Sequence, residues 1–196
     1  MREKTAKVRK GSKLYPQEGQ KELERLAYES SITSYGPPEG TEPDKNGVMK
    51  VTGDDLVEHV EKVRQVPNVA LKVPDGWLAG TDRGEWVGEL VHIPVQGDLN
   101  VLATQNIDDL FYVRDRIVAL SGMAHMMINE GFLLRVEKND TGRYTARMWK
   151  RLPASPTSAW LIEGQRLLVN TEDGGSVIVD RDGNIRMAEC LRVRKD

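Results

Sequence analysis

With 196 residues, 39% of them hydrophobic, and a formal net charge of −2, the chain is long enough to bury a sizeable core without disulfides or metals. The nearly balanced charge gives no overall attraction to nucleic acid or to an anionic membrane, so neither is expected as a partner. The one cysteine cannot form an internal disulfide, and no apolar run reaches the roughly 18 residues of a membrane span.

The N-terminal third is predicted to be a basic arm followed by a helical region. Residues 1–20 carry Lys, Arg, Gly and Pro with few large apolar groups, which is typical of a mobile arm. Residues 21–67 are predicted as the helical region. In it, Leu23 and Leu26 recur at helical spacing, and the Pro- and Gly-rich residues 35–47 form a loop.

The clearest helix of this region is predicted over residues 54–66. Acidic side chains at its start and Pro67 after its end are the expected boundary signals. Four apolar side chains would share one face of the helix: Leu56, Val57, Val60 and Val63. We expect this face to pack on the rest of the chain, so that residues 21–196 fold as one domain.

A pattern of strands and turns occurs three times over residues 68–194, at a spacing of about 40–50 residues. Each repeat reads as strand, tight turn, strand, loop, strand, polar turn and strand. The first two strands of the repeats lie in 69–81, 110–122 and 159–171. The third strands lie in 85–93, 131–138 and 175–180, and the fourth in 99–104, 143–149 and 185–193.

This rhythm resembles that of β-propeller repeat proteins in general, without the signature of a named family. The resemblance covers residues 68–194 and implies a mainly β fold. It would consist of three four-stranded antiparallel meander units with one or two N-terminal helices. Because closed propellers have roughly four to eight blades, three arrangements stay open. They are a partial propeller, a twisted sandwich or open barrel, and a dimer that completes a ring.

The sequence DRDGN in the third repeat resembles part of a calcium-binding loop. Asp180, Asp182 and Asn184 could supply oxygen ligands, but the distal bidentate glutamate of such a loop is absent. Asp-Gly also supplies the positive φ angle of a hairpin turn, and the other repeats have different residues at this place. We therefore predict a turn, and we predict no metal and no other cofactor.

Motifs of known enzyme chemistry are not found in the sequence. His59, His92 and His125 lie far apart without the short spacing of zinc ligands. There is no G-x-S-x-G nucleophile motif and no phosphate-binding glycine loop. We predict no catalytic residue. An enzyme of the hydrolase or lyase class, with a site assembled across the repeats, is the alternative by analogy with other propellers.

Residues 121–131, SGMAHMMINEG, are the segment for which the repeat does not account. They are predicted as a loop, yet the equivalent loops TDRGE and TEDGG are short and polar. The apolar side chains could fold back to plug the core or cover the N-terminal helix, or they could form an adaptable partner-binding surface. The candidate partner-binding residues are Met123, Met126, Met127 and Ile128.

The function that the sequence favours is a non-catalytic protein-binding module with another protein as its partner. Its specific form would be a bacterial toxin-neutralising protein of the immunity or inhibitor type. A homo-oligomer and a structural subunit of a larger assembly are the alternatives. The basic N-terminus has no apolar signal-peptide region, which favours the cytoplasm; a periplasmic or secreted protein with its signal removed would look the same.

Overall fold

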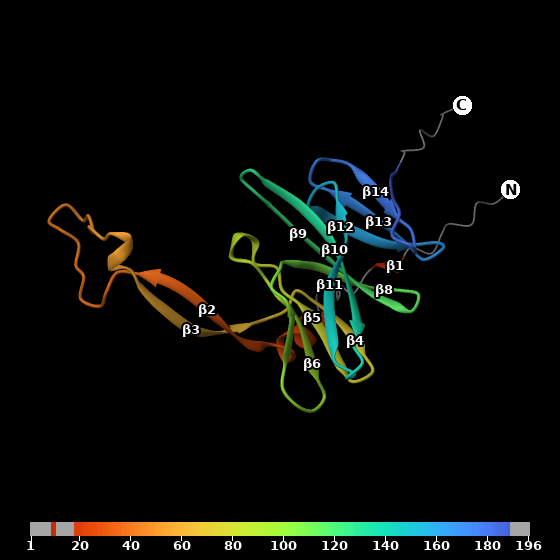
Figure 1. Cartoon of the computed structure of the whole chain (residues 1–196), viewed down its shortest axis with the longest axis horizontal. Helices are drawn as coiled ribbons and strands as arrows, with labels where there is room; N and C mark the ends of the chain where they lie inside the picture. The colour runs from red at the N-terminus through yellow and green to blue at the C-terminus, as the bar shows by residue number, and fades with distance from the viewer. Residues whose placement is uncertain (1–8, 11–17, 189–196) are drawn as a thin grey trace. The chain divides into compact units, whose positions relative to one another are not determined.

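The computed structural model describes residues 9–10 and 18–188, which are mainly β (Figure 1). The chain divides into two compact units. The smaller unit is Ala27–Gln65, and the larger one contains Val66 onwards together with the N-terminal segment up to Leu26. That residues 21–196 fold as one domain stays a prediction.

The larger unit contains the three predicted four-stranded antiparallel meanders, so the predicted fold class is confirmed. The first sheet consists of β4 (Val69–Val73), β5 (Gly76–Gly80), β6 (Leu90–Pro94) and β7 (Asn100–Ala103). The second consists of β8 (Ile107–Val113), β9 (Arg116–His125), β10 (Ile128–Lys138) and β11 (Tyr144–Leu152). The third consists of β12 (Pro156–Ile162), β13 (Arg166–Thr171), β14 (Ser176–Val179) and β15 (Ile185–Met187). The sheets do not close into a propeller.

Two N-terminal segments belong to this unit. Strand β1 (Arg9–Lys10) lies within the predicted arm and pairs antiparallel with β12, which adds a fifth strand to the third sheet. Helix α1 (Glu18–Arg25) confirms the helical spacing of this region, and Leu23 and Leu26 are buried as expected. The other residues of the predicted arm up to 17, and Cys190, lie outside the described part of the chain.

The prediction of a helix over residues 54–66 is wrong. A single 3-10 turn, η1 (Gly53–Asp55), precedes strand β3 (Val57–Gln65), which pairs with β2 (Tyr28–Gly36) to form the ribbon of the smaller unit. Val60, expected on a buried face, is 61% exposed and lies opposite Thr33. The valines of this segment are β-branched and favour strands. A two-stranded ribbon that is exposed on both faces does not require apolar and polar residues to alternate. The helical spacing of these valines therefore did not indicate a helix.

The second sheet is buried on both faces. On β9, Ile117 and Ala119 belong to the core shared with the first sheet, whereas Val118 and Leu120 belong to the core shared with the third. A sheet with one face in water would alternate apolar and polar residues, whereas a sheet covered on both sides reads as a continuous apolar run. The run IVAL in β9 therefore places this sheet in the middle of a three-sheet stack.

The prediction of a turn at DRDGN is confirmed. The Asp180 N–H donates to the Asn184 carbonyl (3.0 Å), and the Gly183 N–H donates to the Asp180 carbonyl (3.0 Å). The Asp180 carboxylate accepts bonds from the backbone N–H groups of Asp182 and Asn184 and from the Asn184 side-chain amide. These bonds, that of the Asn184 amide first, lower the pKa of Asp180. Gly183 has φ +83°, so the need for glycine is conformational.

Gly174 and Gly183 have similar positive φ angles but different surroundings. Comparing them separates the cost of the backbone conformation from the cost of a clash with neighbouring side chains. Gly174 (φ +78°) has open space where a Cβ would lie, whereas a Cβ at Gly183 would lie 2.6 Å from the Trp149 ring. We expect Gly174→Ala to lower the free energy of unfolding by about 1–2 kcal/mol, the usual cost of the left-handed conformation. Gly183→Ala should lower it clearly more, because Trp149 must also move. Urea unfolding of both variants measures this, and equal losses would contradict the packing at Trp149.

Candidate functional site

Strands β9 and β10 extend beyond their neighbours as a two-stranded ribbon. β8 pairs with β9 only as far as Ser121, and β11 pairs with β10 only from Gly131 onwards. Among the described strands, residues 123–125 and 128–130 therefore pair only with each other. The sequence predicts a loop for this segment, and that prediction is wrong. The apolar segment is not an irregular insertion but a longer version of the repeat's central hairpin.

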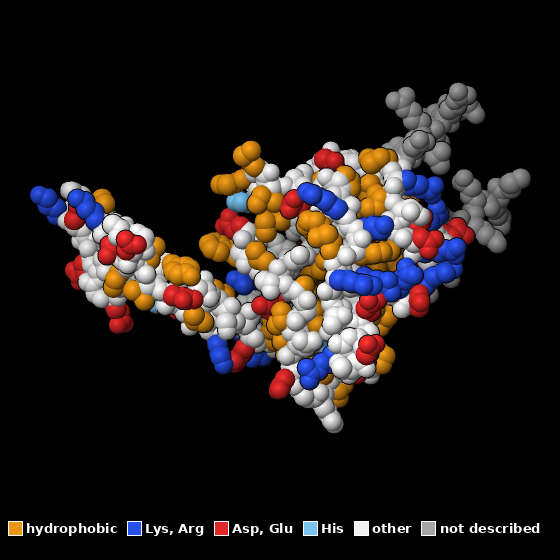
Figure 2. Space-filling model, in the orientation of Figure 1, with side chains coloured by type: hydrophobic (Ala, Val, Ile, Leu, Met, Phe, Trp, Pro, Cys, Tyr) orange, Lys and Arg blue, Asp and Glu red, His pale blue; other side chains and the backbone are white. Residues whose placement is uncertain are grey.

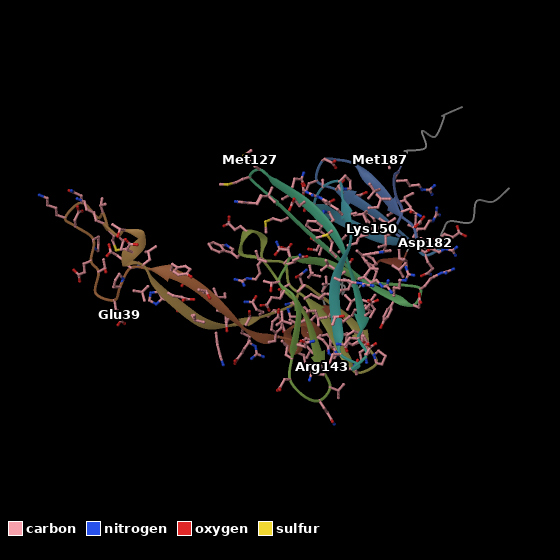
Figure 3. The ribbon with its side chains drawn as sticks, viewed as in Figure 1. Glu39, Met127, Arg143, Lys150, Asp182 and Met187 are labelled. Carbon is pink, nitrogen blue, oxygen red and sulfur yellow. The ribbon has the colours of Figure 1, made fainter. Side chains whose placement is uncertain are left out.

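The ribbon ends in a turn that contains Met127 (Figure 3). His125 pairs with Ile128, so Met126 and Met127 form a two-residue turn. The exposed fractions are 92% for Met126, 100% for Met127 and 47% for Ile128, while Met123 nearer the base is half-buried. The interpretation that this segment folds back to plug the core is therefore wrong for both turn methionines.

A short 3-10 turn, η2 (Gly84–Trp86), lies against the ribbon. The Glu85 carboxylate and the His125 Nε2 atom are 3.0 Å apart, and Trp86 is 72% exposed. We call Trp86, Met126, Met127 and Ile128 the apolar tip. Figure 2 shows hydrophobic side chains gathered at this end of β9 and β10, with a histidine among them.

Asn106, at the start of β8, fixes the segment that carries Trp86. Its side-chain oxygen accepts the backbone N–H groups of Arg83 (3.1 Å) and Gly88 (2.6 Å). Its amide nitrogen donates to the Gly84 carbonyl (2.7 Å). Because Asn106 is only 4% exposed, these bonds are shielded from water and hold the segment in one arrangement.

An apolar hollow of about 250 Å³ lies at the base of the tip. Met123, Ile128, Phe132 and Val87 contribute its apolar lining. Val87 has φ +55°, which is rare for a β-branched residue, and Met126 has φ +51°. Arg114 and Gln165 have similar φ values in other hairpin turns, so the value at Met126 is that of a turn residue and does not mark a site by itself.

A second hollow, of about 380 Å³, adjoins the apolar one and is acidic. The two share Asn106, Gly122 and Met123 in their linings. Three carboxylates line the second hollow, one from each repeat: Asp82, Asp108 and Glu172. None of the described residues that line it is a lysine or an arginine. We call it the acidic hollow.

A separate polar cluster joins the first sheet to the second. The Lys138 Nζ atom donates to Asp75 Oδ2 (2.8 Å) from the neighbouring sheet. His92 lies with its Nε2 atom 3.7 Å from Asp75 Oδ1 and packs edge-on against Tyr144, with ring centroids 4.7 Å apart. A hollow of about 380 Å³ lies beside this cluster. Its lining also includes Gln96, Asp98, Asn100 and Arg143.

Burial and ion pairing shift the titrations of this cluster. The bond from Lys138 lowers the pKa of Asp75, and burial lowers the pKa of His92. Burial also raises the pKa of Tyr144 to about 12. Among the described residues, this cluster is the one that best resembles the enzyme alternative, in which a site is assembled across the repeats. The Nε2 atom of His92 is buried and has no hydrogen-bond partner among the described residues, while the bond between Lys138 and Asp75 joins the two sheets.

Sequence reasoning found part of this surface. It named the four residues Met123, Met126, Met127 and Ile128, which the structure places along one ribbon. It missed Trp86, for which a large aromatic residue in a polar, glycine-rich loop was a usable signal. It also missed the bond between Asp75 and Lys138, because these residues are 63 positions apart. His92 and His125 do not converge, because they have different carboxylate partners, and His59 belongs to the smaller unit.

Comparisons with known proteins leave the family open. No family model matches the chain, and neither the curated proteins nor the solved structures contain a significant match. Within the described residues, no helix has the length and apolar character needed to cross a membrane. The function therefore has to be argued from the surface itself.

Because His92 is buried, the stability of the folded chain should depend on pH. The unfolded chain protonates this histidine near pH 6.5, whereas the folded chain does so only at lower pH. Between these two pKa values the unfolded state binds more protons than the folded state. The stability that neutral, buried His92 contributes is therefore fully present above pH 6.5 and is lost as the pH falls to the folded pKa. In urea unfolding from pH 7.5 down to 5, wild type should lose more stability than His92→Gln. A constant difference between the two proteins would contradict the burial of this ring.

Proposed function

We propose that this chain is a non-catalytic protein-binding module that contacts its partner through the apolar tip. One observation carries the proposal: two almost fully exposed methionines occupy the turn of a ribbon that extends beyond its sheet. Exposed apolar groups that gather in one place typically mark an interaction surface. Tryptophan is also enriched among the residues that dominate binding energies.

Local structure does not account for the choice of methionine. A two-residue hairpin turn with a positive φ favours Gly, Asn or Asp at that position. The other two-residue turn of the same sheet, between β8 and β9, is charged, with Arg114 (φ +59°) and Asp115. Met126 adopts a similar φ without turn chemistry to favour it. We infer that methionine at this exposed position has a role outside the fold.

The construction of the tip suits binding. The strands of the ribbon continue into the buried middle sheet, so its direction is fixed before binding and little ordering entropy is lost. The methionine side chains themselves stay adaptable and polarizable. A fixed ribbon with adaptable side chains suits an uneven protein surface. Neutralisation of a toxin is the narrower form of the proposal and requires that this contact cover the partner's own site.

Site-specific crosslinking tests the proposal. Met127 is replaced by the photo-crosslinking residue p-benzoylphenylalanine in cells that naturally make the protein, and Met148, 60% exposed on β11, serves as the matched control. We expect irradiation to give a discrete protein adduct from position 127 and not from position 148. The yield of that adduct should fall when Trp86→Ala is added, because the tip has lost its largest anchor.

Mass spectrometry of the adduct identifies the partner, either a different protein or a second copy of this chain. The folded state should be unaffected, since exposed substitutions usually change stability by no more than about 0.5 kcal/mol. No adduct at position 127, or the same adducts from both positions, would contradict a contact through the tip.

A further inference from the structure

The apolar hollow and the acidic hollow form one continuous surface, because Gly122 and Met123 belong to the linings of both. Ile128 of the apolar tip also lines the apolar hollow. A partner segment that runs from the tip across the apolar hollow therefore reaches the carboxylates of the acidic hollow. The chemistry of those carboxylates then limits which partners can bind.

Two carboxylates of the acidic hollow, Asp82 and Glu172, are not compensated by a cation of the described residues. Asp82 Oδ1 accepts a hydrogen bond from the backbone N–H of Gly84 (2.9 Å). By contrast, Glu130 of the same ribbon already pairs with Arg151 at 2.6 Å. The negative charges of Asp82 and Glu172 therefore complement a cation supplied by a partner.

We infer that the partner segment carries a lysine or arginine side chain that enters the acidic hollow, next to an apolar side chain that packs on the tip. This inference rests on the proposed function and adds the chemistry of the partner to it. The charge of the hollow complements a cation and repels an acidic segment. The neighbouring apolar hollow then favours a large apolar residue next to the basic residue of the partner.

The shape of the surface fits such a side chain. Lysine and arginine bury their aliphatic stems along apolar walls while the charged head reaches polar groups. Here Gly122, Met123 and Ala124 would contact the stem, and the carboxylates of Asp82 and Glu172 would receive the head. Arginine has the additional advantage of a planar fork that can bond two oxygens of a carboxylate together.

A peptide selection tests this inference with the intact chain. A phage-displayed library of random twelve-residue peptides is selected on wild type, and the enriched peptides are synthesised. Their affinities are then measured for wild type and for Asp82→Asn with Glu172→Gln. The asparagine keeps the oxygen that accepts the Gly84 N–H, so the two changes remove charge and leave the local bond in place. The matched control is Asp115→Asn with Asp140→Asn, two exposed carboxylates in other turns.

We expect the enriched peptides to contain lysine or arginine next to a large apolar residue. Loss of the two hollow charges should weaken their binding about tenfold, the usual scale for charge-assisted bonds, and the control pair should leave it unchanged. Binding should also weaken as salt is raised. Enriched peptides without a basic residue, or affinities that the hollow variant does not change, would overturn the inference.

A tip variant separates this inference from the proposed function. Met126→Ser with Met127→Ser should also abolish peptide binding, whereas Met148→Ser with Met187→Ser, 60% and 61% exposed on other strands, should not. Peptides that depend on the tip and not on the acidic hollow leave the proposed function standing and overturn the partner chemistry. Peptides that depend on neither, or no enrichment at all, overturn both.

Discussion

Burial of the middle sheet on both faces is the constraint on which the larger unit depends. A four-stranded meander with one face in water would be a small, marginal sheet. Here β8, β9 and β10 supply one set of side chains to the first sheet and the alternate set to the third. The outer sheets are then each covered on the face that meets the middle sheet, and the three repeats stack without closing into a ring.

The close packing of the stack also explains how the ribbon at the ends of β9 and β10 is held. The cross-strand pair Gly122 and Gly131 lies at its base, and a Cβ at either position would meet the third repeat, at Pro156 and at the Ala154 carbonyl respectively. Glycine at both positions lets the chain entering the third sheet pass close to β9 and β10. The ribbon therefore leaves the stack from a tightly packed base, which keeps the apolar tip and the two hollows in a fixed arrangement.

The sequence specifies the sheets better than the surface that they carry. Alternation and turn residues such as Asp-Gly place nearly every strand of the three repeats, because each pairs with its neighbour in sequence. The error at residues 54–66 has a local cause: Val57, Val60 and Val63 have helical spacing but lie in a ribbon with no core to impose alternation. The error at 121–131 arose because methionine is not a turn residue, so the Met126–Met127 turn was not recognised. Contacts between repeats, such as Asp75 with Lys138, depend on how the sheets stack and have no local signal.

Hydrogen exchange of the backbone amides in native conditions tests the central role of the middle sheet most directly. If the stack depends on that sheet, the amides of Val118 and Leu120 in β9 and of Leu133 in β10 should exchange only through global unfolding. Amides of the outer sheets should exchange no more slowly than these, and those of the exposed ribbon around Val60 much faster. Slowest exchange in β5 or β13, with β9 and β10 opening earlier, would contradict the account.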